Sequence, residues 1–447
     1  MSNEQGDREY LLQGFRRRTA RVGVIGLGYV GLPLAEAFVL AGFSVTGFDI
    51  DESKPHLLNA GRTYLKHIAE DRIAAIVGTG KFRATSDFSD LGGMDAILIC
   101  VPTPLTRFRE PDLKFVVATG EAILPQLRAG QLVVLESTTW PGTTTEVLKP
   151  ILESSGLRSG VDFHLAYSPE REDPGNPDYG ASTIPKVVGG DGEAALELAT
   201  CLYGQVIGHV VPVSSSATAE AVKLTENVFR AVNIALVNEL KLIYDRMGID
   251  VWEVIDAAKT KPFGYMPFYP GPGLGGHCIP IDPFYLTWKA REHGIATRFI
   301  ELAGEINTEM PRHVVRRLAE ALDAQSGKGL KGARILLVGL AYKKNIDDIR
   351  ESPAFAIIEL LEERGAAVDY YDPFVAQIPM TREHAPLAGR RSVDWSPEAL
   401  ESYDAAFICT DHDDVDYAGL VAHSRLVVDT RNATRNITEH RERIVKA

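Results

Sequence analysis

A glycine- and proline-rich stretch, residues 271–284, carries the residues best suited to covalent chemistry. It reads Gly-Pro-Gly-Leu-Gly-Gly-His-Cys-Ile-Pro-Ile-Asp-Pro-Phe, so Cys278 precedes Asp282 by four residues. Glycines let a backbone come close to a ligand, and prolines stiffen the chain that follows the thiol. Such a turn suits a nucleophilic cysteine, but a tight loop around a buried, unreactive cysteine fits the same pattern. From this stretch alone both interpretations stay open.

Three glycines near the N-terminus, Gly26, Gly28 and Gly31, form a Gly-x-Gly-x-x-Gly motif between an expected strand and an expected helix. In this context the first glycine makes the turn, the second admits a pyrophosphate, and the third lets the helix pack closely on the strand. The helix N-terminus adds N–H donors and partial positive charge. The motif, with Tyr29 and Val30 inside it, therefore predicts a dinucleotide-binding site.

A second expected strand, residues 44–49, ends in Asp49, which follows Gly28 by 21 residues. A carboxylate at this position accepts hydrogen bonds from ribose hydroxyls and repels a 2′-phosphate. The spacing therefore predicts NAD rather than NADP as the cofactor.

Further apolar runs, at residues 95–101, 132–137 and 163–168, fit one parallel sheet with the first two strands. Runs at residues 186–189 and 206–212 would complete it. Open α/β sheets bind ligands beyond the carboxyl ends of their strands, where polar loops follow these runs. A threonine in such a loop also suits a helix cap, and a glutamate there also suits a solvated charge run. The candidates to face the nicotinamide and the substrate are Thr103, Thr138 and Glu170.

Helical patterns dominate the middle of the chain, and the longest covers residues 216–246. Within it Lys223 and Asn227 are four residues apart, so both lie on one face. A lysine in an apolar stripe either covers surface with its stem or is held for chemistry. The helix alone favours the first interpretation. Shorter helical patterns follow at residues 251–259, 282–289 and 300–323.

After a glycine- and lysine-rich linker, residues 325–332, the chain repeats its opening pattern. A strand, a helix that ends in glycine, and a strand closed by an acid recur within residues 333–372. The first loop of this repeat lacks the three-glycine motif and carries Lys343, Lys344 and Arg350. It suits a different phosphate-bearing ligand, or it completes the cofactor site.

The predicted fold class is therefore α/β, with two doubly wound, Rossmann-like domains joined by a helical central domain. Residues 1–20 are expected to be a polar N-terminal arm, either flexible or a short helix. The expected domains are an NAD-binding domain at 21–213, a helical central domain with the cysteine loop at 214–324, and a C-terminal domain at 325–447.

Composition excludes several classes of partner. A net charge of −13 argues against nucleic acid, because phosphate contact needs clusters of Lys and Arg. The four cysteines lie far apart, which disfavours a zinc site or disulfides and fits a reducing cytosol. No run approaches the roughly 20 apolar residues of a membrane span, and none resembles a signal peptide. We expect a cytoplasmic protein without a metal site or a membrane partner.

The chain resembles the UDP-glucose/GDP-mannose dehydrogenase family, with matching motifs from about Val22 to Asp429. The resemblance implies an N-terminal NAD domain, a helical middle that dimerises, and a C-terminal domain for the nucleotide sugar. The implied partners are a UDP-sugar and further copies of this chain, as a homodimer or a higher homo-oligomer. The motifs follow one another in the family's order, at residues 26–33, 137–141, 168–170, 223–227, 275–282 and 343–352.

The resemblance also implies that a sugar 6-hydroxymethyl group is oxidised to a carboxylate in two NAD-dependent steps. Cys278 matches the thiol that attacks the aldehyde stage, because the aldehyde gives up a hydride once a nucleophile has made its carbon tetrahedral. Lys223 and Asp282 match the polar pair that moves protons, orders water and stabilises the oxyanion. Asn227 matches an amide that binds the substrate or the oxyanion.

Other matches surround the reacting groups. Glu170 and Thr138 match positions near the reacting carbon and the nicotinamide, and Arg350 matches a contact to the cofactor pyrophosphate. The implied cofactor contacts are Gly26, Gly28, Tyr29, Val30, Gly31, Asp49, Thr103, Thr138 and Arg350. The implied substrate contacts are Glu170, Arg171, Lys223, Asn227, Gly275, Gly276 and Lys343.

The sugar is the most open point. His277 and the Ile-Pro-Ile after the thiol resemble the branch that acts on UDP-N-acetylhexosamines. Residues 263–270 resemble enzymes for UDP-N-acetylglucosamine more than enzymes for the manno epimer. UDP-N-acetylmannosamine and UDP-glucose remain alternatives, because a methyl-sized difference is worth only about 1–3 kcal/mol in a pocket.

Two other classes of function stay open. One is a catalytically silent NAD-binding protein that keeps the fold, against which intact Cys278, Lys223 and Asp282 speak. The other is a one-step alcohol dehydrogenase or a C4-epimerase-like enzyme, whose mechanism has no need of the thiol.

Overall fold

A computed structural model describes residues 3–65, 68–106, 108–171, 183–276, 278–381 and 384–447. The chain forms two compact units. The first contains Met1–Glu226 and Phe284–Ala296, and the second contains Asn227–Pro283 and Thr297–Ala447. The predicted domain boundaries are a finer division and stay predictions.

One eight-stranded sheet forms the core of the first unit, in the order β3-β2-β1-β4-β5-β6-β7-β8. Every neighbouring pair is parallel except β6 and β7, where Ala166 lies opposite Gly190. The sequence predicts that the sheet stays parallel through β7. The antiparallel pairing of β6 with β7 shows that this prediction is wrong. The strands are β1 (Arg21–Ile25), β2 (Ser44–Phe48), β3 (Phe82–Thr85), β4 (Ala96–Ile99), β5 (Leu132–Leu135), β6 (His164–Tyr167), β7 (Lys186–Gly190) and β8 (Val210–Val213).

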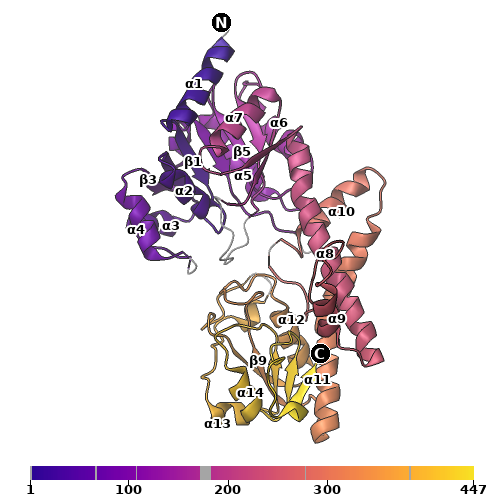
Figure 1. Ribbon diagram of the computed structural model, residues 1–447. Coiled ribbons are helices and arrows are strands. Elements are labelled where there is room, and N and C mark those ends of the chain that lie inside the picture. The colour runs from indigo at the N-terminus through magenta and orange to yellow at the C-terminus, as the bar shows by residue number, and fades with distance from the viewer. Residues whose placement is uncertain (1–2, 66–67, 107, 172–182, 277, 382–383) are drawn as a thin grey trace. The chain divides into compact units, whose positions relative to one another are not determined.

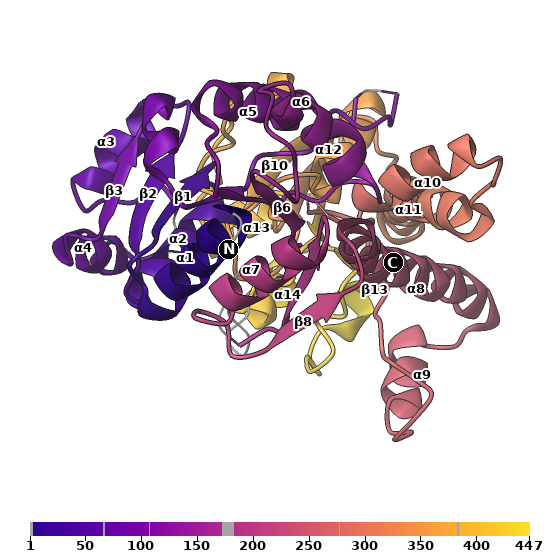
Figure 2. The ribbon, with the colours of Figure 1, turned by 90° about the horizontal axis from the view of Figure 1, so that it is seen from above.

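Helices cover both faces of this sheet, as a doubly wound fold requires. Figure 2 shows α1 (Asn3–Arg17), α2 (Gly31–Leu40) and α7 (Glu193–Tyr203) on one face, and α5 (Lys114–Ile123) and α6 (Lys149–Glu153) on the other. Helices α3 (Ser53–Asn59) and α4 (Glu70–Gly78) lie at the β3 edge (Figure 1).

The N-terminal segment is a helix rather than a flexible arm. Helix α1 buries Leu11, Leu12 and Phe15 in the core on the α2 and α7 side of the sheet. Its apolar face thereby becomes part of the first unit.

Helix α8 (Ser216–Met247) runs from the first unit into the second and matches the predicted long helix within one residue. After α8 the chain forms two short helices, α9 (Val251–Ala258) and α10 (Asp282–Glu292), and then the long helix α11 (Arg298–Ser326). Gly327 ends α11 in the left-handed conformation with φ +61°. The amide groups of Asn238 and Asn307 bond each other, with Nδ2 of Asn238 at 2.8 Å from Oδ1 of Asn307.

This amide pair also holds the start of the cysteine stretch. Oδ1 of Asn238 accepts a hydrogen bond from the Gly271 N–H at 3.0 Å. Nδ2 of Asn307 donates to the Ala231 carbonyl at 3.1 Å. The buried amides therefore join α8, α11 and the first residue of the glycine-rich stretch.

A second, wholly parallel sheet has the order β10-β9-β11-β12-β13. Numbered within its own domain, this is the 2-1-3-4-5 order of doubly wound folds. Ser352 caps α12 by accepting a bond from the Ala354 N–H, with Pro353 in the first turn. The elements are β9 (Arg334–Val338), α12 (Pro353–Glu363), β10 (Ala367–Tyr371), α13 (Pro397–Glu401), β11 (Ala405–Ile408), α14 (Tyr417–His423), β12 (Val427–Asp429) and β13 (Ile444–Lys446).

Candidate active site

The three glycines after β1 have different surroundings. A Cβ at Gly26, which has φ +91°, would lie 2.4 Å from the Cys100 carbonyl oxygen, and one at Gly31 would lie 1.9 Å from the Gly26 carbonyl oxygen. A Cβ at Gly28 would meet no atom within 4 Å. The positive φ at Gly26 and the close approaches at both positions fit the turn and packing roles predicted for Gly26 and Gly31. The open space at Gly28 fits the close approach of a cofactor pyrophosphate.

Asp49 lies buried at the end of β2 and is tied to the glycine loop. Its Oδ2 accepts a hydrogen bond from the Leu27 N–H at 3.0 Å. The same oxygen lies 2.8 Å from Nζ of Lys54, in α3. Sequence reasoning missed Lys54, and its position five residues after the acid was the available signal. The acid fits NAD, and its neighbouring cation is held by it.

This pair generates a prediction about cofactor choice. Replacing Asp49→Ser removes the repulsion of a 2′-phosphate and leaves Lys54 to attract one. We expect the ratio of kcat/KM for NADP to that for NAD to rise at least tenfold, about 1.4 kcal/mol. The double variant Asp49→Ser/Lys54→Ala should lose most of that gain, and Asp51→Ser, at the exposed acid two residues on, should leave the ratio unchanged. An unchanged ratio in Asp49→Ser would show that Asp49 does not select the cofactor.

Ser137 connects the loops that carry Thr103 and Thr138. Its Oγ accepts a bond from the Val101 N–H at 3.0 Å and donates to the Val101 carbonyl at 2.7 Å. Thr103 is buried and Thr138 half-buried. The structure therefore brings together the loops after β4 and β5, while the ligand contacts of both threonines stay predictions.

The Glu170 carboxylate belongs to a cluster of hydrogen bonds and ion pairs and not to a solvated run of charges. Its Oε1 accepts a hydrogen bond from the Arg171 N–H at 2.6 Å, and its Oε2 lies 3.3 Å from Nζ of Lys186. Arg171 is itself occupied, because its guanidinium pairs with Glu226 of α8 at 2.5 Å and donates to the Pro185 carbonyl at 2.6 Å. Arg171 thus ties the loop after β6 to α8, and its substrate contact stays a prediction.

Glu220 lies one turn before Lys223 on α8, and both side chains are buried. Its carboxylate accepts hydrogen bonds from the Gly142 N–H at 2.5 Å, the Thr144 N–H at 2.9 Å and the Thr144 hydroxyl at 2.6 Å. These bonds attach the segment that follows the residue 137–141 motif to the helix of Lys223. Burial raises the pKa of Glu220 to about 7, although the three donors oppose the rise.

The raised pKa gives a pH-dependent prediction. An acid whose pKa is higher in the fold than in the unfolded chain, about 4.3, adds stability below pH 4 that is lost as pH rises through 7. Wild type should therefore lose up to about 3 kcal/mol of unfolding free energy relative to Glu220→Gln between pH 5 and pH 8.

Urea unfolding of both proteins across that range measures this difference. The control is Glu239→Gln, at an exposed carboxylate of the same helix, which should follow the wild-type pH profile. Parallel profiles for wild type and Glu220→Gln would contradict a titrating Glu220.

In the second unit, Cys278, Asp282 and Asn227 lie together. Cys278 is half-buried, and its carbonyl accepts a hydrogen bond from the Asp282 N–H at 2.9 Å. The buried Asp282 carboxylate accepts a bond from Nδ2 of Asn227 at 2.6 Å. The thiol residue therefore begins a turn whose last residue is the acid at the start of α10. His277 lies outside the described residues.

The glycines before the thiol make room for Tyr342, in the loop after β9. A Cβ at Gly275 would lie 2.5 Å from the Tyr342 Cβ, and one at Gly276 would lie 2.8 Å from its ring. The Gly276 N–H also donates to the Arg350 carbonyl at 3.0 Å. Packing against this loop therefore requires both glycines, and their substrate contacts stay predictions.

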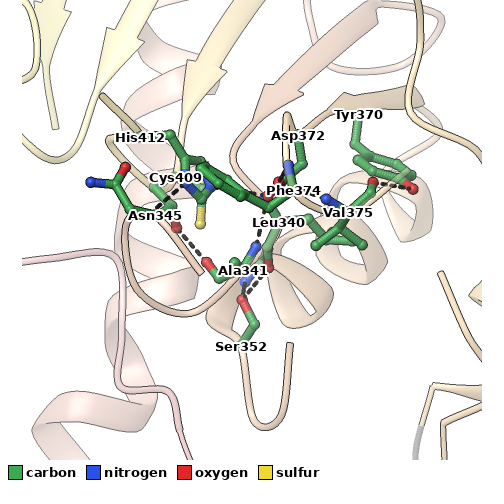
Figure 3. A network of polar contacts seen from close by, with 12 residues as sticks. Leu340, Ala341, Asn345, Ser352, Tyr370, Asp372, Phe374, Val375, Cys409 and His412 are labelled. Carbon is green, nitrogen blue, oxygen red and sulfur yellow. Dashed lines mark hydrogen bonds and ion pairs between the residues drawn. The ribbon is translucent and has the colours of Figure 1, made fainter. Parts of the chain in front are cut away.

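A polar network, shown in Figure 3, anchors the loop after β9. Asp372, at the end of β10, accepts hydrogen bonds from the Leu340 and Ala341 N–H groups at 2.6 and 3.0 Å. The Asn345 N–H donates to Nδ1 of His412 at 3.0 Å. The proton of a neutral His412 is therefore on Nε2, which lies 3.1 Å from Asp372. Burial raises the pKa of Asp372, but these hydrogen bonds outweigh it and hold the pKa below its ordinary value.

The cations of this loop lie on its outer part. Arg350 is exposed and pairs with Asp348, its Nη2 lying 2.6 Å from the carboxylate. Lys343 is half-buried. Their phosphate contacts stay predictions.

Among the described residues no helix is long and apolar enough to cross a membrane. Over the same residues, no group of three or more His, Cys, Asp or Glu side chains has the arrangement of a metal site.

A doubly wound sheet, a three-glycine turn and an acid at the end of β2 define a dinucleotide-dependent dehydrogenase. Profiles of three domains of one family match the chain, namely the NAD-binding, central and UDP-binding domains of the UDP-glucose/GDP-mannose dehydrogenase family, at residues 20–207, 217–309 and 336–436. The chain belongs to this family and is an NAD-dependent oxidoreductase of the nucleotide-sugar dehydrogenase type.

Several relatives are similar over most of their length. The UDP-N-acetyl-D-glucosamine 6-dehydrogenase of Pseudomonas aeruginosa is 40% identical, over 80% of this chain and 83% of its own. The NDP-N-acetyl-D-galactosaminuronic acid dehydrogenase of Ralstonia nicotianae is 35% identical, over 92% and 95%. A solved UDP-D-ManNAc dehydrogenase from Pyrococcus horikoshii is 35% identical, with a TM-score of 0.83 over 94% of this chain and 96% of that one.

Proposed function

We propose that this enzyme oxidises the C6 hydroxymethyl group of a UDP-N-acetylhexosamine, most directly UDP-N-acetylglucosamine, to the uronic acid. Relatives that carry N-acetylhexosamine names support the substrate class. The observation that carries the chemistry is the linked set of Cys278, Asp282 and Asn227. A thiol, a carboxylate and an amide within one turn and its partner helix suit a covalent aldehyde oxidation.

The proposed reaction has two oxidations. In the first, the C6 hydroxyl gives up a proton and C6 gives up a hydride, leaving an aldehyde. The Cys278 thiolate then adds to the aldehyde carbon, forming a C–S bond, and the resulting oxyanion takes up a proton to give a thiohemiacetal. Loss of a second hydride, together with that hydroxyl proton, gives a thioester, and water breaks the C–S bond to release the acid and the thiol. NAD, when bound, would supply the hydride acceptor for each oxidation, so two NADH are expected for each sugar.

Each side chain has a proposed task. Lys223 and Asp282 move protons, order the attacking water and stabilise the oxyanion. Asn227 orients Asp282 through their hydrogen bond. The side-chain amide of Asn227 also binds the substrate. Glu170 and Thr138 act near the reacting carbon and the nicotinamide. Arg350 contacts the cofactor pyrophosphate, and Lys343 the nucleotide sugar.

The thiol is tested by Cys278→Ala. We expect this variant to lose at least a thousandfold in formation of the acid, because the thiohemiacetal no longer forms. Wild type should make two NADH for each UDP-N-acetylglucosamine consumed, measured by absorbance together with chromatography of the product. Cys201→Ala, which removes a half-buried thiol of α7, should keep wild-type turnover. Normal formation of the uronate by Cys278→Ala would exclude the thioester mechanism.

The sugar is resolved by NADH production with a panel of UDP- and GDP-sugars that includes the gluco, manno and galacto N-acetyl epimers. We expect UDP-N-acetylglucosamine to give the highest kcat/KM. A higher value for UDP-N-acetylmannosamine or UDP-glucose would correct the substrate and keep the mechanism. One NADH for each sugar would indicate a one-step dehydrogenase, and none with any sugar would indicate a silent NAD-binding protein.

The cellular role proposed from this product is supply of a uronate precursor for polysaccharide or glycan synthesis in the cytoplasm. Nucleotide-sugar uronates are donors for glycosyl transfer, so a glycosyl-transferring enzyme would consume the product.

We also propose that α8 forms a homodimer interface. Phe229, Leu236, Ile243 and Met247 are exposed on this helix at spacings of seven, seven and four residues. Such spacing puts them on one face, and a row of exposed large apolar side chains is typical of a contact between chains.

The interface is tested by Leu236→Glu/Ile243→Glu. A charge on this stripe should be unfavourable between two copies, so we expect the mass in light scattering to fall from that of a dimer to that of one chain. Leu40→Glu, at an exposed leucine that ends α2, should leave the mass unchanged. A dimer that persists in the double variant would place the interface elsewhere.

A further inference from the structure

A buried charge cluster lies at the carboxyl ends of β5 and β6. Nζ of Lys186 lies 2.6 Å from Oε2 of Glu136 and 3.3 Å from Oε2 of Glu170. The side chains of Glu136, Lys186 and Glu170 are 0%, 6% and 17% exposed. The Tyr203 hydroxyl donates to the other oxygen of Glu136. The cluster therefore runs from a fully buried carboxylate, through the lysine, to a carboxylate near the surface of the unit.

The antiparallel strand puts the lysine there. In a parallel strand the first residue lies at the edge of the sheet opposite to the ligand-binding loops. Strand β7 runs against β6, pairing Tyr167 with Gly189, so its first residue, Lys186, lies beside the carboxyl end of β6. The Ser168 hydroxyl donates to the Val187 carbonyl at 2.9 Å and fixes this register.

Burial and the neighbouring charges act in opposite directions on the groups of this cluster. Burial lowers the pKa of Lys186, but the two carboxylates outweigh it and the pKa lies above its ordinary value. Burial raises the pKa of Glu136 above its ordinary value, and Lys186 opposes that rise without cancelling it. A buried ion pair contributes little net stability compared with apolar packing, so its presence at this edge calls for another role.

We infer that Lys186 is a positioning residue for Glu170, held in place by Glu136. The lysine fixes the direction of the Glu170 carboxylate and favours its ionised form. Glu136 precedes Ser137, which joins the loops of Thr103 and Thr138. One buried ion pair thus ties the position of Glu170 to those loops. This inference rests on the role proposed for Glu170 near the reacting carbon.

The test compares pH profiles of kcat and KM for UDP-N-acetylglucosamine and NAD. In Lys186→Met the loss of the neighbouring cation disfavours ionised Glu170, so the acidic limb of kcat should move to higher pH. We expect kcat at neutral pH to fall at least tenfold while both KM values change less than threefold. Lys186→Arg keeps the charge and should restore kcat to within threefold of wild type, with the wild-type acidic limb.

Two further variants separate positioning from folding. The double variant Glu136→Gln/Lys186→Met removes both members of the buried ion pair, so it leaves no unpaired carboxylate at position 136. Its acidic limb of kcat should move to higher pH, as in Lys186→Met. Lys241→Met removes another buried lysine, paired with Asp245 at 2.8 Å in α8. Lys241→Met should lower the melting temperature and keep the wild-type pH profile. Lys186→Met would give the same result if Lys186 had only a structural role.

Glu170→Gln distinguishes the inference from the proposed function. If Glu170→Gln keeps kcat within threefold of wild type, the role proposed for Glu170 is wrong and the inference falls with it. If Glu170→Gln loses activity while folded Lys186→Met and the double variant keep the wild-type kcat and acidic limb, the positioning role of Lys186 is overturned and the role of Glu170 stands.

Discussion

Buried carboxylates that accept hydrogen bonds from loop N–H groups hold the chemistry-bearing loops of this protein. Asp49 accepts a hydrogen bond from the Leu27 N–H in the glycine turn. Asp372 accepts hydrogen bonds from the Leu340 and Ala341 N–H groups in the corresponding turn of the second sheet. Glu220 accepts hydrogen bonds from the Gly142 and Thr144 N–H groups. A charged acceptor makes these bonds stronger than neutral ones, and burial makes them costly to lose. Loops that would otherwise move are thereby fixed to strands and helices that do not, which is the condition for precise positioning of reactive groups.

The two sheets use this device in parallel and then diverge. Gly26 and Gly339 both have positive φ, and a Cβ at either would lie 2.4 Å from a carbonyl oxygen of a neighbouring strand end. In the first sheet, space at Gly28 and a helix N-terminus remain for a pyrophosphate. In the second, His412 bonds the buried acid, and the loop carries cations and packs on the glycines beside Cys278. One architecture therefore serves dinucleotide binding in one unit and packing against the Cys278 loop in the other.

Much of this could be predicted from sequence, because the strong signals are local. Apolar periodicity located α8 and most strands, and the spacing from Gly28 to Asp49 located the cofactor turn. The direction of β7 could not be predicted, because a short apolar run carries no information about which way it pairs. The partners of Lys186 lie 16 and 50 residues away, and Tyr342 lies more than 60 residues from the glycines that accommodate it. Such contacts depend on the assembled sheet, so the sequence indicated that glycines were needed but not which neighbour required them.

Cys278 as the covalent carrier of the substrate is the central chemical claim, and its most direct measurement is peptide mass spectrometry of the enzyme quenched in acid during turnover. With NAD and the UDP-sugar that the enzyme oxidises, the peptide that contains Cys278 should carry the nucleotide uronyl group as a thioester, which hydroxylamine removes. An unmodified Cys278 peptide at every quench time, while the acid product accumulates, would contradict the claim.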